Sequence, residues 1–143
     1  MNSIHLICLG VRNIEISLAF YRDGLGFETT AEEQKPAIVF FNNGGSRLEL
    51  FPLENLQKEI GEAADVTSEG FPRFTLAHNT TSKEEVDAML SRAEQAGAIV
   101  VKKAVVQTWG GYSGYFKDPD GFIWEVAYGE DWEFNDQGML VIP

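Results

Sequence analysis

The pattern of apolar and polar positions divides the chain into two similar halves. The first half opens with a strand-like run at 4–11, followed by a helix that Asn13 is suited to cap. Two more strand-like runs follow, at 37–41 and 47–51. The helix is predicted from apolar residues at spacings of four, three and four: Ile14, Leu18, Tyr21 and Leu25.

The second half repeats this order. A strand-like run at 74–78 precedes a helix that starts with a capping box, Ser82 to Glu85, and that Gly97 ends. The Asp-Pro-Asp-Gly turn at 118–121 predicts a hairpin between the last two strands, because proline presets φ and glycine accepts positive φ. The strand-like runs after the helix are 99–106, 112–117 and 122–128.

This internal repeat, with a period of about 55–60 residues, predicts an α+β fold. Neither half can bury its sheet alone, so the halves are expected to form one cupped sheet with helices on its outer face. We expect a single domain over 1–143, with a tail that folds back as an edge strand or packs across a partner. Its expected parts are module one at about 1–53, an acidic, helix-prone linker at 54–70, module two at about 71–129, and the tail at 130–143.

Strand alternation also predicts which side chains point into the cup, because successive residues face opposite sides. In the first strand Leu9 and Val11 suit the helix side, which leaves Leu6 and Cys8 on the concave side. In the strand before the second helix, His78 has the outward parity. The residues predicted to face the concavity include Arg47, Glu49, Phe51, Arg73, Thr75 and Glu125.

Composition narrows the possible partners. A net charge of −11 argues against nucleic-acid binding, which needs a basic surface, and mildly favours a cationic ligand. There is no apolar run long enough to span a membrane and no secretory signal, so we expect a cytoplasmic protein without a membrane partner. The single cysteine, Cys8, excludes an intrachain disulfide and is expected to be a small hydrophobe.

Four segments of the chain form a recognisable set: LGVRNIEISLAFYRDGLGF at 9–27, RLELF at 47–51, AGA at 96–98 and GYFKDPDGFIWEV at 114–126. Together they resemble the vicinal oxygen chelate superfamily. This group includes glyoxalase I, extradiol dioxygenases, and fosfomycin- and bleomycin-resistance proteins. The resemblance implies two βαβββ modules that form a cupped mixed sheet, usually in a homodimer, with a small-molecule site inside each cup.

Enzymes of this superfamily typically hold a divalent metal with one residue from each of four strands. The resemblance puts the four positions at Leu6, Glu49, Arg73 and Glu125. Leu6 has no donor atom and Arg73 stays protonated, so we expect no metal and no other cofactor. The alternative is Zn, Ni or Mn bound by Glu49 and Glu125, joined by His5 only if the first strand is bulged.

Without a metal, the two glutamates would repel each other by about 3 kcal/mol at a separation of about 5 Å. We hypothesise that the fork of Arg73 bridges Glu49 and Glu125 in a polar, metal-free cavity. Either glutamate has two open interpretations, a structural salt bridge or a contact with a ligand.

Three aromatic residues of the glycine-rich segment at 109–115 could wall the mouth of the cavity or pack in the core or an interface. They are Trp109, Tyr112 and Tyr115. Trp132 and Phe134 are expected to anchor the tail.

Two functions from different classes remain open. The first is a binding protein for a small organic molecule, similar to bleomycin-resistance proteins. The second is a metal-dependent lyase or isomerase similar to glyoxalase I, or one in which Glu125 or Glu49 is the general base. The sequence identifies neither a catalytic residue with certainty nor the ligand.

Overall fold

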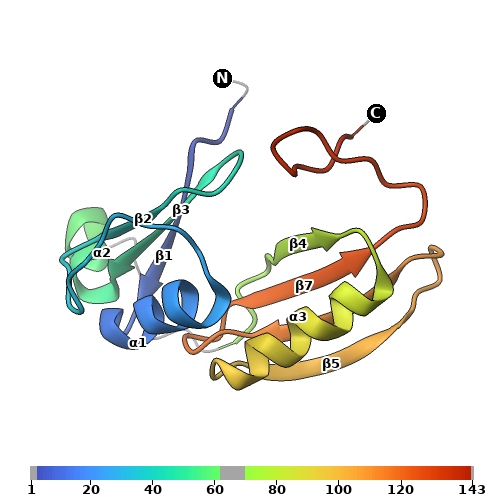
Figure 1. The fold of residues 1–143 in the computed structure, drawn as a ribbon. Helices are drawn as coiled ribbons and strands as arrows, with labels where there is room; N and C mark the ends of the chain where they lie inside the picture. The colour runs from blue at the N-terminus through green and yellow to red at the C-terminus, as the bar shows by residue number, and fades with distance from the viewer. Residues whose placement is uncertain (1–2, 62–69, 143) are drawn as a thin grey trace. The chain divides into compact units, whose positions relative to one another are not determined.

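The computed structural model describes residues 3–61 and 70–142 (Figure 1). The chain splits into two compact units, Met1–Phe71 and Pro72–Pro143. Residues 62–69 of the predicted linker lie outside the described residues. In the described part of the chain, no helix is long and apolar enough to cross a membrane.

The first unit contains a three-stranded sheet in the order β1-β3-β2. β1 pairs with β3 in parallel, and β2 pairs with β3 in antiparallel orientation. Within the described residues, the first module therefore has three strands, whereas a full βαβββ module has four. The strands are β1 Leu6–Val11, β2 Val39–Phe41 and β3 Arg47–Pro52.

The first helix begins where the sequence predicts. Asn13 caps α1, Ile14–Leu18, by accepting hydrogen bonds from the backbone N–H groups of the next helical turn. The helix continues as a π-helical segment, η1, Ala19–Leu25, which ends at Gly26 in the left-handed conformation. The buried side chains of α1 and η1 pack with those of the sheet. The core of this unit includes Leu9, Val11, Leu18, Phe20, Tyr21, Phe41 and Leu50.

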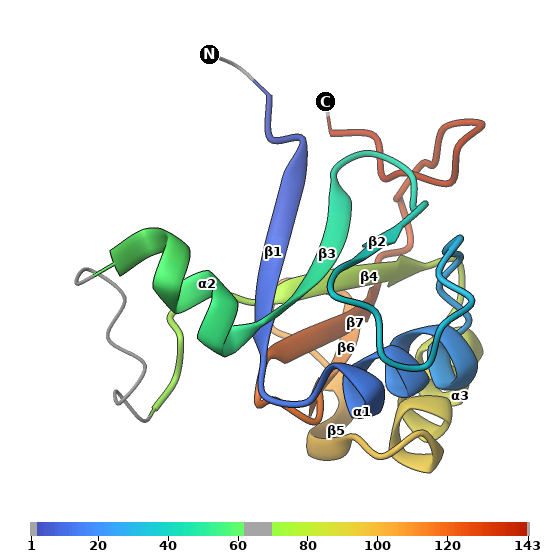
Figure 2. The ribbon, with the colours of Figure 1, turned by 90° about the vertical axis from the view of Figure 1, so that its left-hand side faces the viewer.

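A further helix, α2, Leu53–Ile60, forms the start of the predicted linker and confirms its helix-prone character. It packs against β1 at Gly10, where a Cβ atom would lie 2.9 Å from the Leu53 side chain and 3.0 Å from that of Leu56. Because Gly10 alternates with the buried residues Leu9 and Val11, α2 covers the sheet face opposite the core. Figure 2 shows α2 and α1 on different sides of β1.

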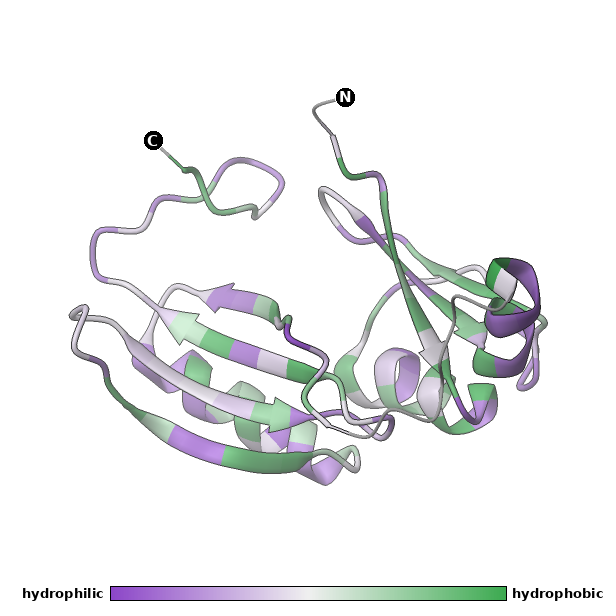
Figure 3. Ribbon diagram, turned by 180° about the vertical axis from the view of Figure 1, so that it is seen from behind, coloured by the Kyte–Doolittle hydropathy of each residue, from purple (hydrophilic) through white to green (hydrophobic). Residues whose placement is uncertain are grey.

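The second unit contains a four-stranded sheet in the order β4-β7-β6-β5. β4 is parallel to β7, and the other neighbouring strands are antiparallel. Figure 3 shows edge strand β5 hydrophobic at both ends and hydrophilic in the middle, where Lys102 and Lys103 lie. The strands are β4 Leu76–Thr80, β5 Ile99–Val106, β6 Tyr112–Lys117 and β7 Ile123–Tyr128.

One helix, α3, Lys83–Gln95, covers one face of this sheet. Ser82 caps it as predicted, because its side chain accepts from the backbone N–H of Glu85. The buried residues of α3 are Val86, Leu90 and Ala93. Together, the two open mixed sheets with their helices confirm the predicted α+β class.

Two strand predictions in this unit need correction. The strand expected at 74–78 begins at Leu76 and continues to Thr80, so Arg73 and Thr75 precede it. Arg73 has a φ of 65°, which is left-handed backbone and incompatible with an extended strand. The tail pairs with itself, through a bridge between Phe134 and Leu140, instead of adding an edge strand to the described sheet.

Trp132 anchors the tail, as predicted. Its ring stacks on that of Trp109, with 5.8 Å between the ring centres and 11° between the planes. Trp109 therefore contacts the tail.

Candidate functional site

The face of the second sheet that α3 leaves open carries Glu125 and Tyr115 opposite each other on β7 and β6. Tyr115 Oη donates a hydrogen bond of 2.8 Å to Glu125 Oε1. Both side chains are partly buried. Lys102 on β5 places its ammonium 5.8 Å from the centre of the Tyr115 ring, within cation–π range. We call Glu125 and Tyr115 the carboxylate–phenol pair.

The protonation state of Tyr115 follows from its surroundings. The pKa of Tyr115 is raised, first by burial and then by its hydrogen bond to the negatively charged Glu125, both of which disfavour the phenolate. Tyr115 is therefore a hydrogen-bond donor at neutral pH. Within the described residues, Glu125 Oε2 accepts no hydrogen bond, so one carboxylate oxygen is left for an incoming donor.

Arg73 does not fill the place that strand alternation predicted. It precedes β4, is exposed, and forms no ion pair with Glu125 among residues 70–142. The partner of Glu125 within this unit is the hydroxyl of Tyr115, which stabilises the carboxylate without cancelling its charge. Whether Arg73 reaches Glu49 stays a prediction, because the two residues belong to different units.

The first sheet carries a second carboxylate on the face opposite its core. Glu49 is only 7% exposed and lies between Cys8 on β1 and Phe40 on β2. Cys8 Sγ donates a weak hydrogen bond of 3.5 Å to Glu49 Oε1. Burial, followed by the charge of Glu49, raises the pKa of the Cys8 thiol to about 12. The thiol is therefore not a nucleophile at neutral pH.

Cys8 is expected to alkylate slowly even though it is exposed. At pH 8 a thiol with a pKa of about 12 is roughly one part in ten thousand thiolate, so iodoacetamide should react at least about a hundredfold more slowly than with free cysteine. Glu49→Gln removes the charge but not the burial and should accelerate the reaction by about tenfold. A rate like that of free cysteine in the unchanged protein would contradict this.

The remaining predicted site residues are dispersed. Arg47 is exposed and its Nη1 donates a 2.8 Å hydrogen bond to Asn42. Phe51 is the register partner of Gly10, on the face that α2 covers. Tyr112 lies on the α3 side of its sheet, where its hydroxyl donates to Asp87 at 3.0 Å. Tyr112 therefore lies on the face of its sheet opposite Glu125.

The residues present do not fit the four-ligand metal site of the superfamily. Leu6 lies on the same face as Glu49 and has no donor atom. His5 precedes β1 without a bulge, because its carbonyl accepts from the Arg47 N–H in register, and its ring is hydrogen-bonded to Ser3. The described residues contain no cluster of three His, Cys, Asp or Glu side chains that could hold a metal.

Comparison with protein families decides the membership of the chain. The model of the Glyoxalase/Bleomycin resistance protein/Dioxygenase superfamily matches residues 3–126. The protein belongs to this superfamily. The sequence-based prediction of the superfamily is thereby confirmed.

Relatives of this glyoxalase-superfamily member include proteins whose names state an activity. It is 30% identical to the metallothiol transferase FosB of Shouchella clausii, over 90% of this chain and 82% of that protein. Its fold is similar to a crystal structure of a glyoxalase-related enzyme from Fulvimarina pelagi, with a TM-score of 0.88, 32% identity and 99% of both chains covered. Lactoylglutathione lyase from Agrobacterium tumefaciens is 27% identical, with a TM-score of 0.66 over 94% of this chain and 99% of that one.

Proposed function

We propose that this protein binds a small organic molecule through the carboxylate–phenol pair, without a metal. The observation that carries the proposal is the 2.8 Å hydrogen bond from Tyr115 to Oε1 of Glu125, which orients the carboxylate and leaves Oε2 for a ligand. A partly buried carboxylate with a fixed orientation favours a ligand that presents a cation or a strong N–H donor. The net charge of −11 favours the same class of ligand.

Under this proposal, the face of the first sheet opposite its core carries groups of similar chemistry. Glu49 is a second carboxylate and is 7% exposed. The exposed ring of Phe40, beside Glu49, supplies an apolar surface for an aromatic part of the ligand. The protein would sequester its ligand and carry out no reaction.

The test is a thermal-shift screen of cationic aromatic compounds, metal-free bleomycin among them, followed by calorimetry on each compound that binds. Glu125→Gln should weaken binding by about tenfold or more, because a charged hydrogen bond contributes about 1.5–3 kcal/mol. Tyr115→Phe should weaken it less, since the carboxylate remains but loses its orientation.

The matched control is Glu84→Gln, which removes the same charge from an exposed position on α3. It should leave the affinity unchanged within about twofold, because exposed charges at a distance are screened by salt. Equal losses in Glu125→Gln and Glu84→Gln would show a general charge effect, and binding that is insensitive to Glu125→Gln would contradict the proposed site.

The alternative function is a metal-dependent lyase or isomerase. Two observations favour it. Glu49 and Glu125 are of a residue type that can bind a divalent metal, and the chain is similar to FosB and to lactoylglutathione lyase. An assay with methylglyoxal, glutathione and added Zn, Ni or Mn distinguishes the two functions. Turnover that Glu125→Gln abolishes and Arg73→Ala leaves intact would support the alternative.

We further infer a cytoplasmic homodimer, on the strength of the superfamily resemblance. Light scattering should then give about twice the chain mass of 15.9 kDa. A mass equal to that of one chain would contradict the dimer.

A further inference from the structure

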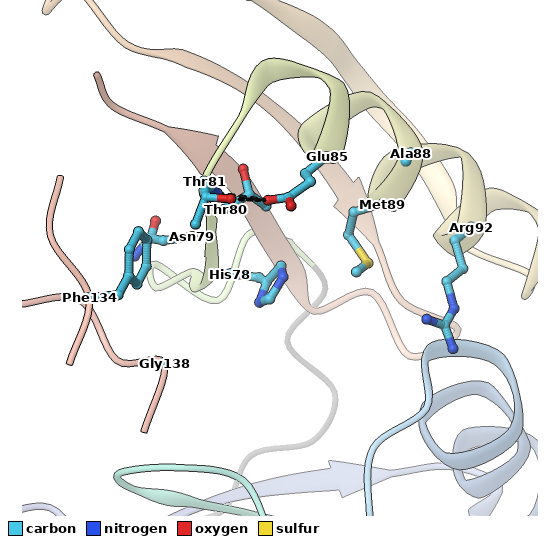
Figure 4. A pocket seen from close by; sticks show the side chains of 10 residues that line it. All are labelled: His78, Asn79, Thr80, Thr81, Glu85, Ala88, Met89, Arg92, Phe134 and Gly138. Carbon is cyan, nitrogen blue, oxygen red and sulfur yellow. Dashed lines mark hydrogen bonds between the residues drawn. The ribbon is translucent and has the colours of Figure 1, made fainter. Parts of the chain in front are cut away.

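A cavity of about 500 Å³ lies on the helix side of the second sheet, between α3, β4 and the C-terminal hairpin (Figure 4). All of its lining residues belong to the second unit. Its volume falls within the range typical of small-molecule pockets. We call it the hairpin pocket, and it is lined by His78, Asn79, Thr80, Thr81, Glu85, Ala88, Met89, Arg92, Phe134 and Gly138.

The hairpin pocket lies along β4, and its α3 wall is on the other face of the sheet from the carboxylate–phenol pair. His78 is the register partner of Val126, whose side chain is buried on the α3 side, whereas Glu125 has the opposite parity. The prediction that His78 faces the helix side of the sheet is thereby confirmed. A molecule in this pocket would therefore not contact Glu125 through the sheet.

Two of the pocket walls are apolar. Ala88 and Met89 form the wall on α3, and Phe134 forms the opposite wall on the tail. Figure 4 shows His78 and Met89 directed toward the space between α3 and the tail. The tail wall is held in two ways, by the bridge of Phe134 to Leu140 and by the stacking of Trp132. A thioether and a phenyl ring facing one space favour an aromatic occupant.

The polar groups of the pocket include one side chain of each charge, Glu85 and Arg92, and therefore favour a ligand without net charge. Burial lowers the pKa of His78 despite the nearby Glu85, so its imidazole is neutral at pH 7 and offers one donor and one acceptor. Glu85 accepts from the backbone N–H and the hydroxyl of Thr81, at 2.8 and 2.9 Å. Among the described residues of this unit, β4 is an edge strand, so one side of its backbone adds N–H and C=O groups to the pocket.

We propose that the hairpin pocket binds a small, uncharged aromatic molecule that carries one N–H or O–H group. The ring lies between Met89 and Phe134, and the polar group forms a hydrogen bond with His78 or the β4 edge. This site goes beyond the function proposed for Glu125 and does not depend on it.

The test uses indole as the probe and the imidazole proton signals of the unchanged protein as the readout. The chain has two histidines, so the signals of His78 are assigned with His78→Gln, and His5 in the other unit is the internal control. Indole should shift the His78 signals saturably, with a Kd of about 1 mM or below. 1-Methylindole, which lacks the N–H donor, should bind at least about threefold more weakly. A shift of His5 alone, or of neither histidine, would overturn the proposal.

Two tryptophan variants of α3 test whether indole binds in the hairpin pocket. Ala88→Trp fills the pocket from an exposed position of α3, and Ser91→Trp adds the same ring at an exposed position of α3 outside the lining. Ala88→Trp should lower the affinity for indole by at least about tenfold, and Ser91→Trp should change it by less than about twofold. Equal affinities in both variants would place the probe elsewhere and overturn the proposal.

Discussion

Replacing Gly114 with alanine is expected to destabilise the protein by about 2–3 kcal/mol, because the site has no room for a methyl group. A Cβ atom at Gly114 would lie 2.8 Å from the backbone nitrogen of Ala104 and 2.9 Å from the carbonyl oxygen of Lys102. Both atoms belong to β5, which pairs with β6 beside Gly114. Relief of the overlap would require two paired strands to move apart, since the third close atom, Leu90 Cδ1 at 2.6 Å, blocks the α3 side.

The matched control is Gly10→Ala in the first unit. There the nearest atoms to a new Cβ are the ends of the Leu53 and Leu56 side chains, which can change rotamer. This substitution should cost less than about 1 kcal/mol. Urea denaturation of both variants measures the difference, and equal losses of stability would show that backbone crowding at Gly114 is not the cause.

Replacing Asp118 with alanine is expected to cost about 2–3 kcal/mol, because its carboxylate organises the last hairpin. Asp118 is 4% exposed, and its Oδ1 accepts from the backbone N–H groups of Asp120 and Phe122 at 2.9 and 2.8 Å. The alanine variant would leave both N–H groups without that acceptor inside the turn. Asp118→Asn keeps one oxygen and should lose less than half as much stability.

This turn also matters for the candidate site. It sets the register between β6 and β7, which places Tyr115 opposite Glu125. Asp118→Ala should therefore weaken the hydrogen bond of the carboxylate–phenol pair as well as the fold. Thermal unfolding measures the loss of stability. Spectrophotometric titration measures the weakening of the hydrogen bond, because the pKa of Tyr115 should then be lower than in the unchanged protein. An unchanged melting temperature in Asp118→Ala would contradict the assigned role.

The sequence predicts the parts of this fold that local chemistry controls. Both helix starts follow from residues whose side chains cap the first turn, Asn13 and Ser82. Alternation correctly assigns Leu9 and Val11 to the core and Glu125 to the open face, since β1 and β7 are regular over their length. The pairing of Tyr115 with Glu125 was also accessible, because the turn at 118–121 fixes which residues of the hairpin are opposite.

The predictions that fail, and the features that the sequence does not reveal, concern segments outside the regular strands and helices. The placement of Arg73 assumed extended backbone three residues before the start of β4 at Leu76, and no sequence signal marks left-handed backbone at an arginine. The packing of α2 on the face opposite the core depends on Gly10, whose missing side chain makes room for Leu53 and Leu56. The hairpin pocket forms only because the tail pairs with itself, through Phe134 and Leu140. Strand alternation predicts which face a residue lies on, but it does not predict such a pairing within the tail.

The central claim is our proposal that the site of this glyoxalase-superfamily member binds no metal. It rests on the missing donor atom of Leu6 and on the finding that no three His, Cys, Asp or Glu side chains among the described residues could hold a metal. The most direct measurement is the metal content of freshly purified protein, followed by titration with Zn²⁺, Ni²⁺ and Mn²⁺. We predict well below one metal per chain and no saturable binding in the micromolar range. Stoichiometric metal bound with low-micromolar affinity or better, and lost in Glu125→Gln, would contradict the claim.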